Sequence, residues 1–325
     1  MIGSVRDFAT VSRWAMAIAA LILPGPAGGA PITALAFAPD NRSLVSSGDR
    51  SVEIRSPTNG VVGRRISVPL HKVMSLAFGN QGRVLAVGGG EPGVRGEVHL
   101  LSWPQGEVLH RLEGHTDVVQ CVAFDADGTR LGVASSDGSV KVWLLSAPRN
   151  KPPVQAVALL GHTGPVLALA FSPSGRTIVS AGADRSIKVW NVQSGALERS
   201  FSQHAEAIHA LAFKPMSGEA GGAPLTCISS SSDRTVRLWQ PDIGRMVRIV
   251  RGHSAEVFAL AWSADGNGFY SAGAEGTLRE FDAQSDAQRR QWQAHDDWVY
   301  ALAVSPDGRI LASGDASGRL ILNRL

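Results

Sequence analysis

The chain has 325 residues, of which 44% are apolar and 18% charged, and its formal net charge is +3. This is the composition of a globular protein, and its 36 glycines and 17 prolines indicate many tight turns. The lysines and arginines are scattered rather than gathered in a stripe, so the charge does not indicate a nucleic-acid surface.

The N-terminal segment differs from the rest of the chain. Arg6 and Arg13 precede an apolar run at 14–23, and prolines, glycines and other small residues follow up to Ala30. This order predicts an export signal that is cleaved near Ala27 or Ala30, and the apolar run is too short to span a bilayer as a helix. We therefore expect an exported protein, located in the periplasm, the cell envelope or outside the cell; a cytoplasmic protein is the alternative.

A short apolar motif recurs through the remaining chain. Its copies are ITALAF (32–37), VMSLAF (73–78), VQCVAF (119–124), VLALAF (166–171), IHALAF (208–213), VFALAW (257–262) and VYALAV (299–304). The alanine of the fifth position stands at 36, 77, 123, 170, 212, 261 and 303, so the copies are 41 to 49 residues apart. Self-similarity at this period predicts a repeat architecture over 31–325.

Each copy contains four short runs separated by turns. In the fourth copy the motif is followed by SPSGR, then TIVSAG, then an Asp-Arg turn and SIKVWN, and a further run leads to the next His. Runs of five to seven residues that are broken by Gly, Asp and Pro turns indicate strands. Four short strands cannot bury both faces alone, and sheets repeated at this period stack around an axis. We therefore predict one all-β domain of seven four-stranded antiparallel sheets.

The recurring motifs resemble those of WD40-repeat proteins. Gly-His, a Pro-Asp-Gly-like turn, Asp-x-Ser/Thr and a terminal Trp recur in that order over 31–325. This resemblance implies a seven-bladed β-propeller in which a His, a Ser, an Asp and a Trp lock each blade. These residue types suit a buried chain of hydrogen bonds, since Trp only donates while Ser and His can both donate and accept.

Carried over by position, the lock is complete in two copies and altered in the others. The complete sets are His162, Ser180, Asp184 and Trp190 in the fourth copy, and His204, Ser229, Asp233 and Trp239 in the fifth. The third has His115, Asp137 and Trp143 with Val133 at the Ser position; the sixth has His253 and Ser271 with Glu275 and Phe281; the seventh has His295 and Ser313 with Ser317 and Asn323. The second has only His71, and the first has only Asp49.

Neither these histidines nor the cysteines predict a metal site. The histidines stand one per blade, so they cannot converge on a single ion. Cys121 and Cys227 lie in apolar runs of different copies and are expected to be buried free thiols. We expect no cofactor and no metal.

The last copy ends after its third strand, at 319–325. In WD40 proteins an N-terminal strand usually supplies the missing fourth strand, and here the only candidate is the run at 17–23. That run is also the core of the expected signal at 1–30, and it has no polar residue, unlike an exposed edge strand. A cleaved signal with a three-stranded last blade is favoured, and ring closure by 17–23 is the alternative.

The resemblance also places the residues that flank each first strand at the mouth of the channel. The candidates for partner binding are Met74, Leu167, His209, Glu256, Phe258, Asp296, Asp297, Trp298 and Tyr300. Aromatic residues with an acidic rim are typical of an interaction hot spot. Phe258 and Tyr300 could instead pack between blades, whereas Trp298 is expected to be exposed.

No catalytic motif accompanies these candidates. The Gly-rich stretch at 88–96 lies between strands and does not open a helix, so we interpret it as a hairpin loop. The sequence favours a non-enzymatic scaffold that binds a protein or peptide, whether alone or as a subunit of a larger complex. An enzyme or small-ligand receptor that uses the central channel is the alternative.

Overall fold

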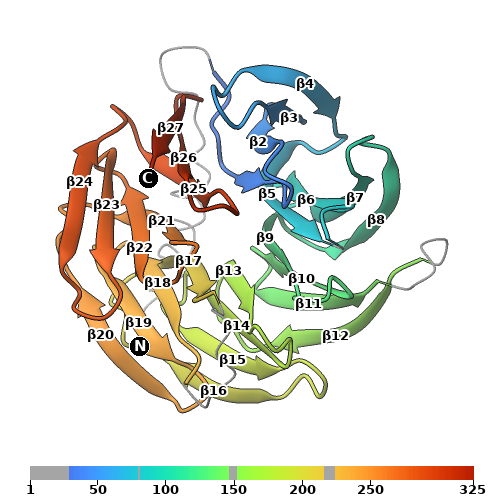
Figure 1. The fold of residues 1–325 in the computed structure, drawn as a ribbon. Helices are drawn as coiled ribbons and strands as arrows, with labels where there is room; N and C mark the ends of the chain where they lie inside the picture. The colour runs from blue at the N-terminus through green and yellow to red at the C-terminus, as the bar shows by residue number, and fades with distance from the viewer. Residues whose placement is uncertain (1–28, 80, 146–151, 216–223) are drawn as a thin grey trace, which may run out of the picture.

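A computed structural model of the chain describes residues 29–79, 81–145, 152–215 and 224–325. The described residues form 27 strands in seven antiparallel sheets arranged around a central axis (Figure 1). The seven-bladed propeller is thereby confirmed, and within the described residues its last blade has the expected three strands. The expected signal and the run at 17–23 lie outside the described residues.

The first four blades follow the chain. Blade 1 contains β1 (Leu35–Phe37), β2 (Leu44–Gly48), β3 (Ser51–Arg55) and β4 (Val62–Ser67). Blade 2 contains β5 (Lys72–Gly79), β6 (Val84–Glu91), β7 (Arg95–Ser102) and β8 (Val108–His115). Blade 3 contains β9 (Val119–Phe124), β10 (Arg130–Ser135), β11 (Ser139–Leu144) and β12 (Val154–Leu160). Blade 4 contains β13 (Val166–Phe171), β14 (Thr177–Gly182), β15 (Ile187–Asn191) and β16 (Leu197–Phe201).

The last three blades complete the ring. Blade 5 contains β17 (Ile208–Phe213), β18 (Cys227–Ser231), β19 (Val236–Gln240) and β20 (Arg245–Val250). Blade 6 contains β21 (Val257–Trp262), β22 (Gly268–Gly273), β23 (Thr277–Asp282) and β24 (Gln288–Gln293). Blade 7 contains β25 (Val299–Val304), β26 (Ile310–Asp315) and β27 (Leu320–Arg324).

Local sequence explains the strand order within a blade. Each strand pairs with the next through a short hairpin, so the first strand of a blade is the innermost and the last is the outermost. In blade 4, Ser180 of β14 lies opposite Leu169 of β13 and Lys188 of β15. Only the central strands are covered on both sides, which accounts for their uninterrupted burial, as in β14 and β18.

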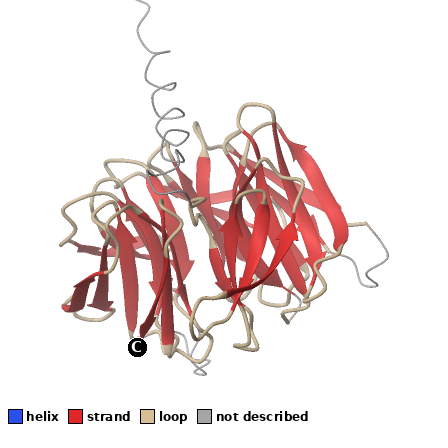
Figure 2. Cartoon of the chain, turned by 90° about the horizontal axis from the view of Figure 1, so that it is seen from above, coloured by secondary structure: helices blue, strands red, loops and turns tan. Residues whose placement is uncertain are grey.

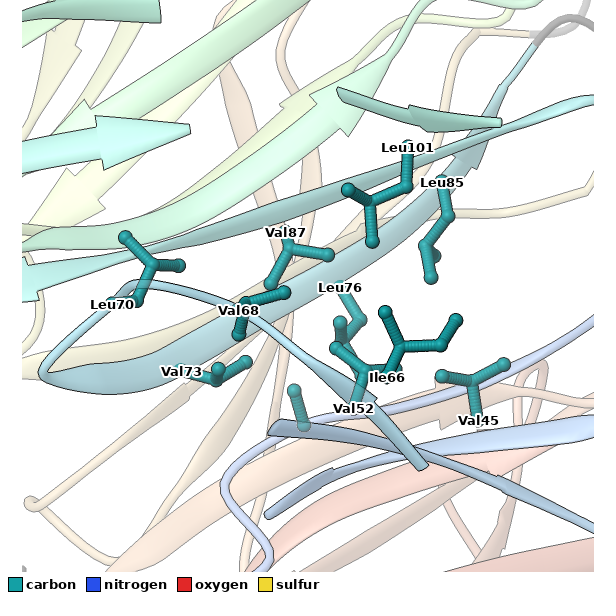
Figure 3. Close-up of a cluster of buried hydrophobic side chains, with 11 residues drawn as sticks. Val45, Val52, Ile66, Val68, Leu70, Val73, Leu76, Leu85, Val87 and Leu101 are labelled. Atoms are coloured by element: carbon teal, nitrogen blue, oxygen red, sulfur yellow. The ribbon is translucent and has the colours of Figure 1, made fainter. Parts of the chain in front are cut away.

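The hydrophobic core lies between neighbouring blades. Between blades 1 and 2, Val45 and Val52 pack with Leu85, Val87 and Leu101, all fully buried (Figure 3). Burying a side chain of this size contributes about 1.5–3 kcal/mol. Each sheet therefore depends on its neighbours for stability.

The ring closes where blade 7 meets blade 1. The innermost strands β25 and β1 lie in contact, and the Ile32 N–H donates a hydrogen bond to the carbonyl oxygen of Asp315 (3.0 Å). In Figure 2 the sheets are seen from the side, with loops gathered at both ends. The connection that enters each innermost strand and the hairpin between the second and third strands share one end, which we call the upper face.

The structure also bears on membrane insertion. No helix in the described part of the chain is long and apolar enough to cross a membrane.

Candidate functional site

Blades 4 and 5 contain the complete lock that positions the upper-face loops. In blade 4, His162 Nδ1 lies 2.8 Å from Asp184 Oδ2 and His162 Nε2 lies 2.8 Å from Ser180 Oγ, which accepts a 2.8 Å hydrogen bond from Trp190 Nε1. Blade 5 repeats this chain with His204, Ser229, Asp233 and Trp239 at 2.7 Å for all three contacts. The lock ties the loop before the innermost strand to the hairpin after the second strand.

Charge in these locks resides on the carboxylates. Burial alone would raise the pKa of Asp184, but hydrogen bonds from His162 and Ser186 hold it well below its ordinary value. The pKa of Asp233 is lowered for the same reasons, with His204 as the partner. Burial lowers the pKa of His204 in turn, so a neutral imidazole beside an ionised carboxylate is the favoured state.

Blade 6 tolerates two substitutions in its lock. Glu275 takes the place of the Asp, and its Oε1 lies 2.6 Å from His253 Nδ1. His253 Nε2 lies 2.7 Å from Ser271 Oγ. Against the effect of burial, hydrogen bonds from Arg279 and Ser254 lower the pKa of Glu275 to about 2. Phe281 fills the indole position without offering a donor.

Blade 7 differs from the sequence expectation. The carboxylate is supplied by Asp315, whose Oδ2 lies 2.7 Å from His295 Nδ1, rather than being replaced by Ser317. His295 Nε2 still lies 2.7 Å from Ser313 Oγ. Ser317 supports the acid, because its Oγ and its N–H donate to Asp315 Oδ1 at 2.8 and 3.0 Å. Asn323, at the Trp position, instead accepts a 3.1 Å hydrogen bond from Trp292 of blade 6.

Blades 1 and 2 replace the lock altogether. In blade 1, Arg55 stands at the Trp position and its Nε donates to Ser46 Oγ at 2.9 Å. In blade 2, buried Val87 and Leu101 occupy the Ser and Trp positions, and His71 is exposed. Spacing alone could not identify these substitutes, because none of them is a residue type of the lock, although Arg55 keeps the hydrogen bond to a serine that the Trp makes elsewhere.

Blade 3 has an incomplete lock with two unpaired groups. His115 Nδ1 lies 2.8 Å from Asp137 Oδ2, but His115 Nε2 and Trp143 Nε1 are buried without a hydrogen-bond partner. Val133, at the Ser position, offers them only methyl groups. Each orphaned polar group of this kind costs about 1–3 kcal/mol.

Val133→Thr is expected to stabilise the protein. Threonine keeps the β-branched shape and supplies the hydroxyl that both orphaned groups lack, so the free energy of unfolding should rise by about 1 kcal/mol. Val142→Thr is the matched control, because Val142 is fully buried in an apolar cluster and its hydroxyl would be unpaired. Urea denaturation should show opposite signs for the two variants; two losses of stability would contradict the interpretation.

The innermost strands of blades 2 to 7 each contain a β-bulge near the upper face. The pairing with the second strand skips the residue that follows the first position of the recurring motif. The skipped residues are Met74, Gln120, Leu167, His209, Phe258 and Tyr300, and Thr33 stands at the same place in blade 1. A bulge re-aims the side chain of the extra residue. We call these seven residues the hub ring.

In blades 2, 4 and 6 a glycine of the second strand closely approaches the backbone before the bulge. A Cβ atom on Gly273 would lie 1.8 Å from the carbonyl oxygen of Glu256, so only glycine fits there. Gly182 stands in the same relation to Pro165, at 2.0 Å. Because these glycines have no side chain, the loop before the bulge can lie directly against the second strand of its own blade.

The aromatic members of the hub ring gather on blades 5, 6 and 7. The His209 ring meets Phe258 edge to face with centroids 5.1 Å apart. Phe258 lies 5.9 Å from Trp298 and 5.6 Å from Tyr300, and the latter two rings stand at 90° to each other, 6.5 Å apart. Phe258 is buried, Tyr300 is half-buried and Trp298 is 38% exposed. We call these four residues the aromatic cluster.

The polar members of the hub ring each have a serine partner. His209 Nε2 lies 2.7 Å from Ser232 Oγ, and Gln120 Nε2 donates to Ser136 Oγ at 2.8 Å. Burial lowers the pKa of His209 to about 4, so the ring is neutral near neutral pH. His209 therefore contributes an aromatic edge rather than a charge.

Carboxylates surround the aromatic cluster. Asp297 Oδ1 accepts a 2.8 Å hydrogen bond from the Trp298 N–H, which fixes the carboxylate beside the indole. Asp296 is 95% exposed and lies 3.4 Å from Arg319. Burial raises the pKa of Tyr300, and the charges of Asp297 and Glu256 raise it further, so both carboxylates lie near the phenol.

The other two candidates lie apart from this cluster. Leu167 is buried in blade 4, and half-buried Met74 lines a cavity of about 430 Å³ between blades 1 and 2. Asp49, Arg50, His71 and Lys72 also line that cavity. Within the described residues, no group of three or more His, Cys, Asp or Glu side chains is placed to hold a metal ion.

Comparison with known families agrees with this geometry. The family model described as WD domain, G-beta repeat matches residues 20–55, 106–143, 154–191, 195–240, 244–282 and 287–322, which is most of the chain. This chain belongs to the WD40 family. The six matches leave out 56–105, where blade 2 has lost the lock while keeping its four strands.

Two curated relatives share part of this WD40 chain. It is 37% identical over 79 residues to Protein ROOT INITIATION DEFECTIVE 3 of Arabidopsis thaliana, covering 24% of this chain and 17% of that protein. It is 35% identical over 106 residues to Target of rapamycin complex subunit wat1 of Schizosaccharomyces pombe, covering 32% of this chain and 33% of that protein. The matches thus span at most about a third of either relative.

Proposed function

We propose that the chain is a non-catalytic scaffold that binds a protein or peptide partner at its upper face. The observation that carries this proposal is the aromatic cluster, with Trp298 38% exposed over buried Phe258. An exposed indole above a packed aromatic base is the usual form of an interaction hot spot. The relative named as a subunit of a complex supports the same role.

The composition of the hub ring favours binding over catalysis. Its members are Thr33, Met74, Gln120, Leu167, His209, Phe258 and Tyr300, and the one titratable imidazole is held neutral. An enzyme or small-ligand receptor that used the channel would need charged groups from several blades converging on the axis. The ring offers apolar and aromatic contact area instead.

Trp298→Ala is expected to weaken partner capture at least about tenfold while leaving the fold intact, because truncating an interface tryptophan costs 2 kcal/mol or more. Affinity capture from the native compartment, with circular dichroism as the folding check, measures both effects. Leu197→Ala is the matched control, since Leu197 is 46% exposed on the outer strand β16. Unchanged capture by the Trp298 variant would exclude this face.

We also propose that the mature protein is exported. The order of basic, apolar and small residues in 1–30 supports a cleaved signal. The first family match supports the rival role as closing strand: it starts at residue 20, and the other five matches start at or just before an outermost strand. N-terminal sequencing of protein from the native cell decides between them. A start near Ala27–Pro31 supports export, and an intact N-terminus contradicts it.

A further inference from the structure

We propose that the aromatic cluster receives a cationic side chain, an arginine or a lysine, from an extended segment of the partner. This inference rests on the proposed scaffold function and adds the chemical class of what the upper face recognises. The argument uses the ring geometry, the carboxylates of the rim and the cations around them.

The rings present faces that attract a cation. Trp298 and Tyr300 stand at 90° with centroids 6.5 Å apart, and Phe258 lies within 5.9 Å of both. Trp298 is 38% exposed, so its indole can be reached from solvent. A positive charge within about 6 Å of an aromatic centroid is attracted by the ring, most strongly by tryptophan.

The rim supplies negative charge at the same place. Glu256 and Asp297 act on the Tyr300 phenol, and Asp297 is fixed beside the Trp298 backbone by a 2.8 Å hydrogen bond. Across the described residues, neither Glu256 nor Asp297 forms an ion pair. A carboxylate left unpaired beside aromatic rings is complementary to a guanidinium or an ammonium.

Among the residues that the structure describes, no cation is paired with Glu256 or Asp297. Arg319 lies 3.4 Å from Asp296, on the outer side of the loop. Arg234 of blade 5 donates a hydrogen bond to the Ser254 carbonyl oxygen at 3.5 Å, so its partner is a backbone group and not a carboxylate.

The test uses a defined probe, the N-acetylated and C-amidated peptide Gly-Gly-Arg-Gly-Gly. A second peptide carries citrulline, which keeps the shape of arginine and removes its charge, and a third carries lysine. Binding is followed by NMR of the tryptophan indole N–H signals, with the Trp298 signal assigned from its loss in Trp298→Ala. We expect the arginine peptide to shift this signal, and the citrulline peptide to bind at least about fivefold more weakly.

Variants of the rim separate charge from shape. Asp297→Asn and Glu256→Gln should each weaken binding of the arginine and lysine peptides and reduce its salt dependence. Asp127→Asn is the matched control, because Asp127 is exposed on the hairpin between β9 and β10 at the opposite end of blade 3. This variant should bind as the wild type does.

The outcomes distinguish this inference from the scaffold proposal. Equal binding of the arginine and citrulline peptides, or no shift of the Trp298 signal at millimolar peptide, would overturn the cationic preference. If Trp298→Ala abolishes partner capture while Asp297→Asn and Glu256→Gln leave it unchanged, the scaffold stands and the cationic preference fails. If Trp298→Ala still captures the partner as the wild type does, the upper face is excluded as the partner-binding site.

Discussion

Ser229→Ala is expected to lower the free energy of unfolding by about 2–6 kcal/mol. The hydroxyl of Ser229 contacts both His204 Nε2 and Trp239 Nε1 at 2.7 Å, so its removal leaves two buried polar groups without partners. Each such group costs about 1–3 kcal/mol. Urea denaturation, monitored by tryptophan fluorescence and circular dichroism, measures the loss.

The neighbouring serine provides the control for this experiment. Ser230 is equally buried on the same strand, but its hydroxyl has no hydrogen-bond partner. Ser230→Ala should therefore be neutral or stabilising, since it removes a buried group that is already unpaired. Equal losses for the two variants would show that strand packing, not the hydrogen-bond chain, determines the stability of blade 5.

Asp315→Ala is expected to lower the free energy of unfolding by at least about 3 kcal/mol, because it leaves several buried donors without an acceptor and each costs about 1–3 kcal/mol. The Asp315 and His295 side chains are 1% and 0% exposed. The carboxylate also accepts the backbone N–H groups of Ser317 and Arg319 at 3.0 and 2.8 Å, so its loss frees the hairpin as well as the imidazole. Urea denaturation of the variant gives the measurement.

Ser317→Ala separates the two assignments of the acid position in blade 7. Ser317 contributes one hydroxyl hydrogen bond to Asp315 Oδ1, so its removal should cost about 1 kcal/mol or less. If Ser317→Ala destabilised the protein as much as Asp315→Ala does, the serine would be the essential member of the lock.

The repeated architecture could be predicted because its determinants are local. Each turn and alternating run acts within a few residues, and a period of 41–49 residues repeats them seven times. The complete locks of blades 4 and 5 follow from the same regularity. Neighbouring blades come from consecutive copies, so the gathering of Phe258, Trp298 and Tyr300 also follows from the order of the chain.

The residues that the sequence analysis missed are determined by which side chains meet in the folded blade, and not by their separation along the chain. Asp315 stands two positions before the expected acid, yet its carboxylate reaches His295 because it lies at the end of β26. Arg55 replaces an indole because its guanidinium can also donate to a serine. The β-bulges that form the hub ring depend on the pairing of two strands, and no residue type in a single strand encodes them.

The junction between blades 7 and 1 is expected to unfold locally before the rest of the propeller. Within the described residues, β27 pairs with β26 alone, and β1 has three residues. A strand with one neighbour separates at a lower free energy than a strand enclosed on both sides. Amide protons of β27 should consequently exchange with solvent deuterium well before those of β22.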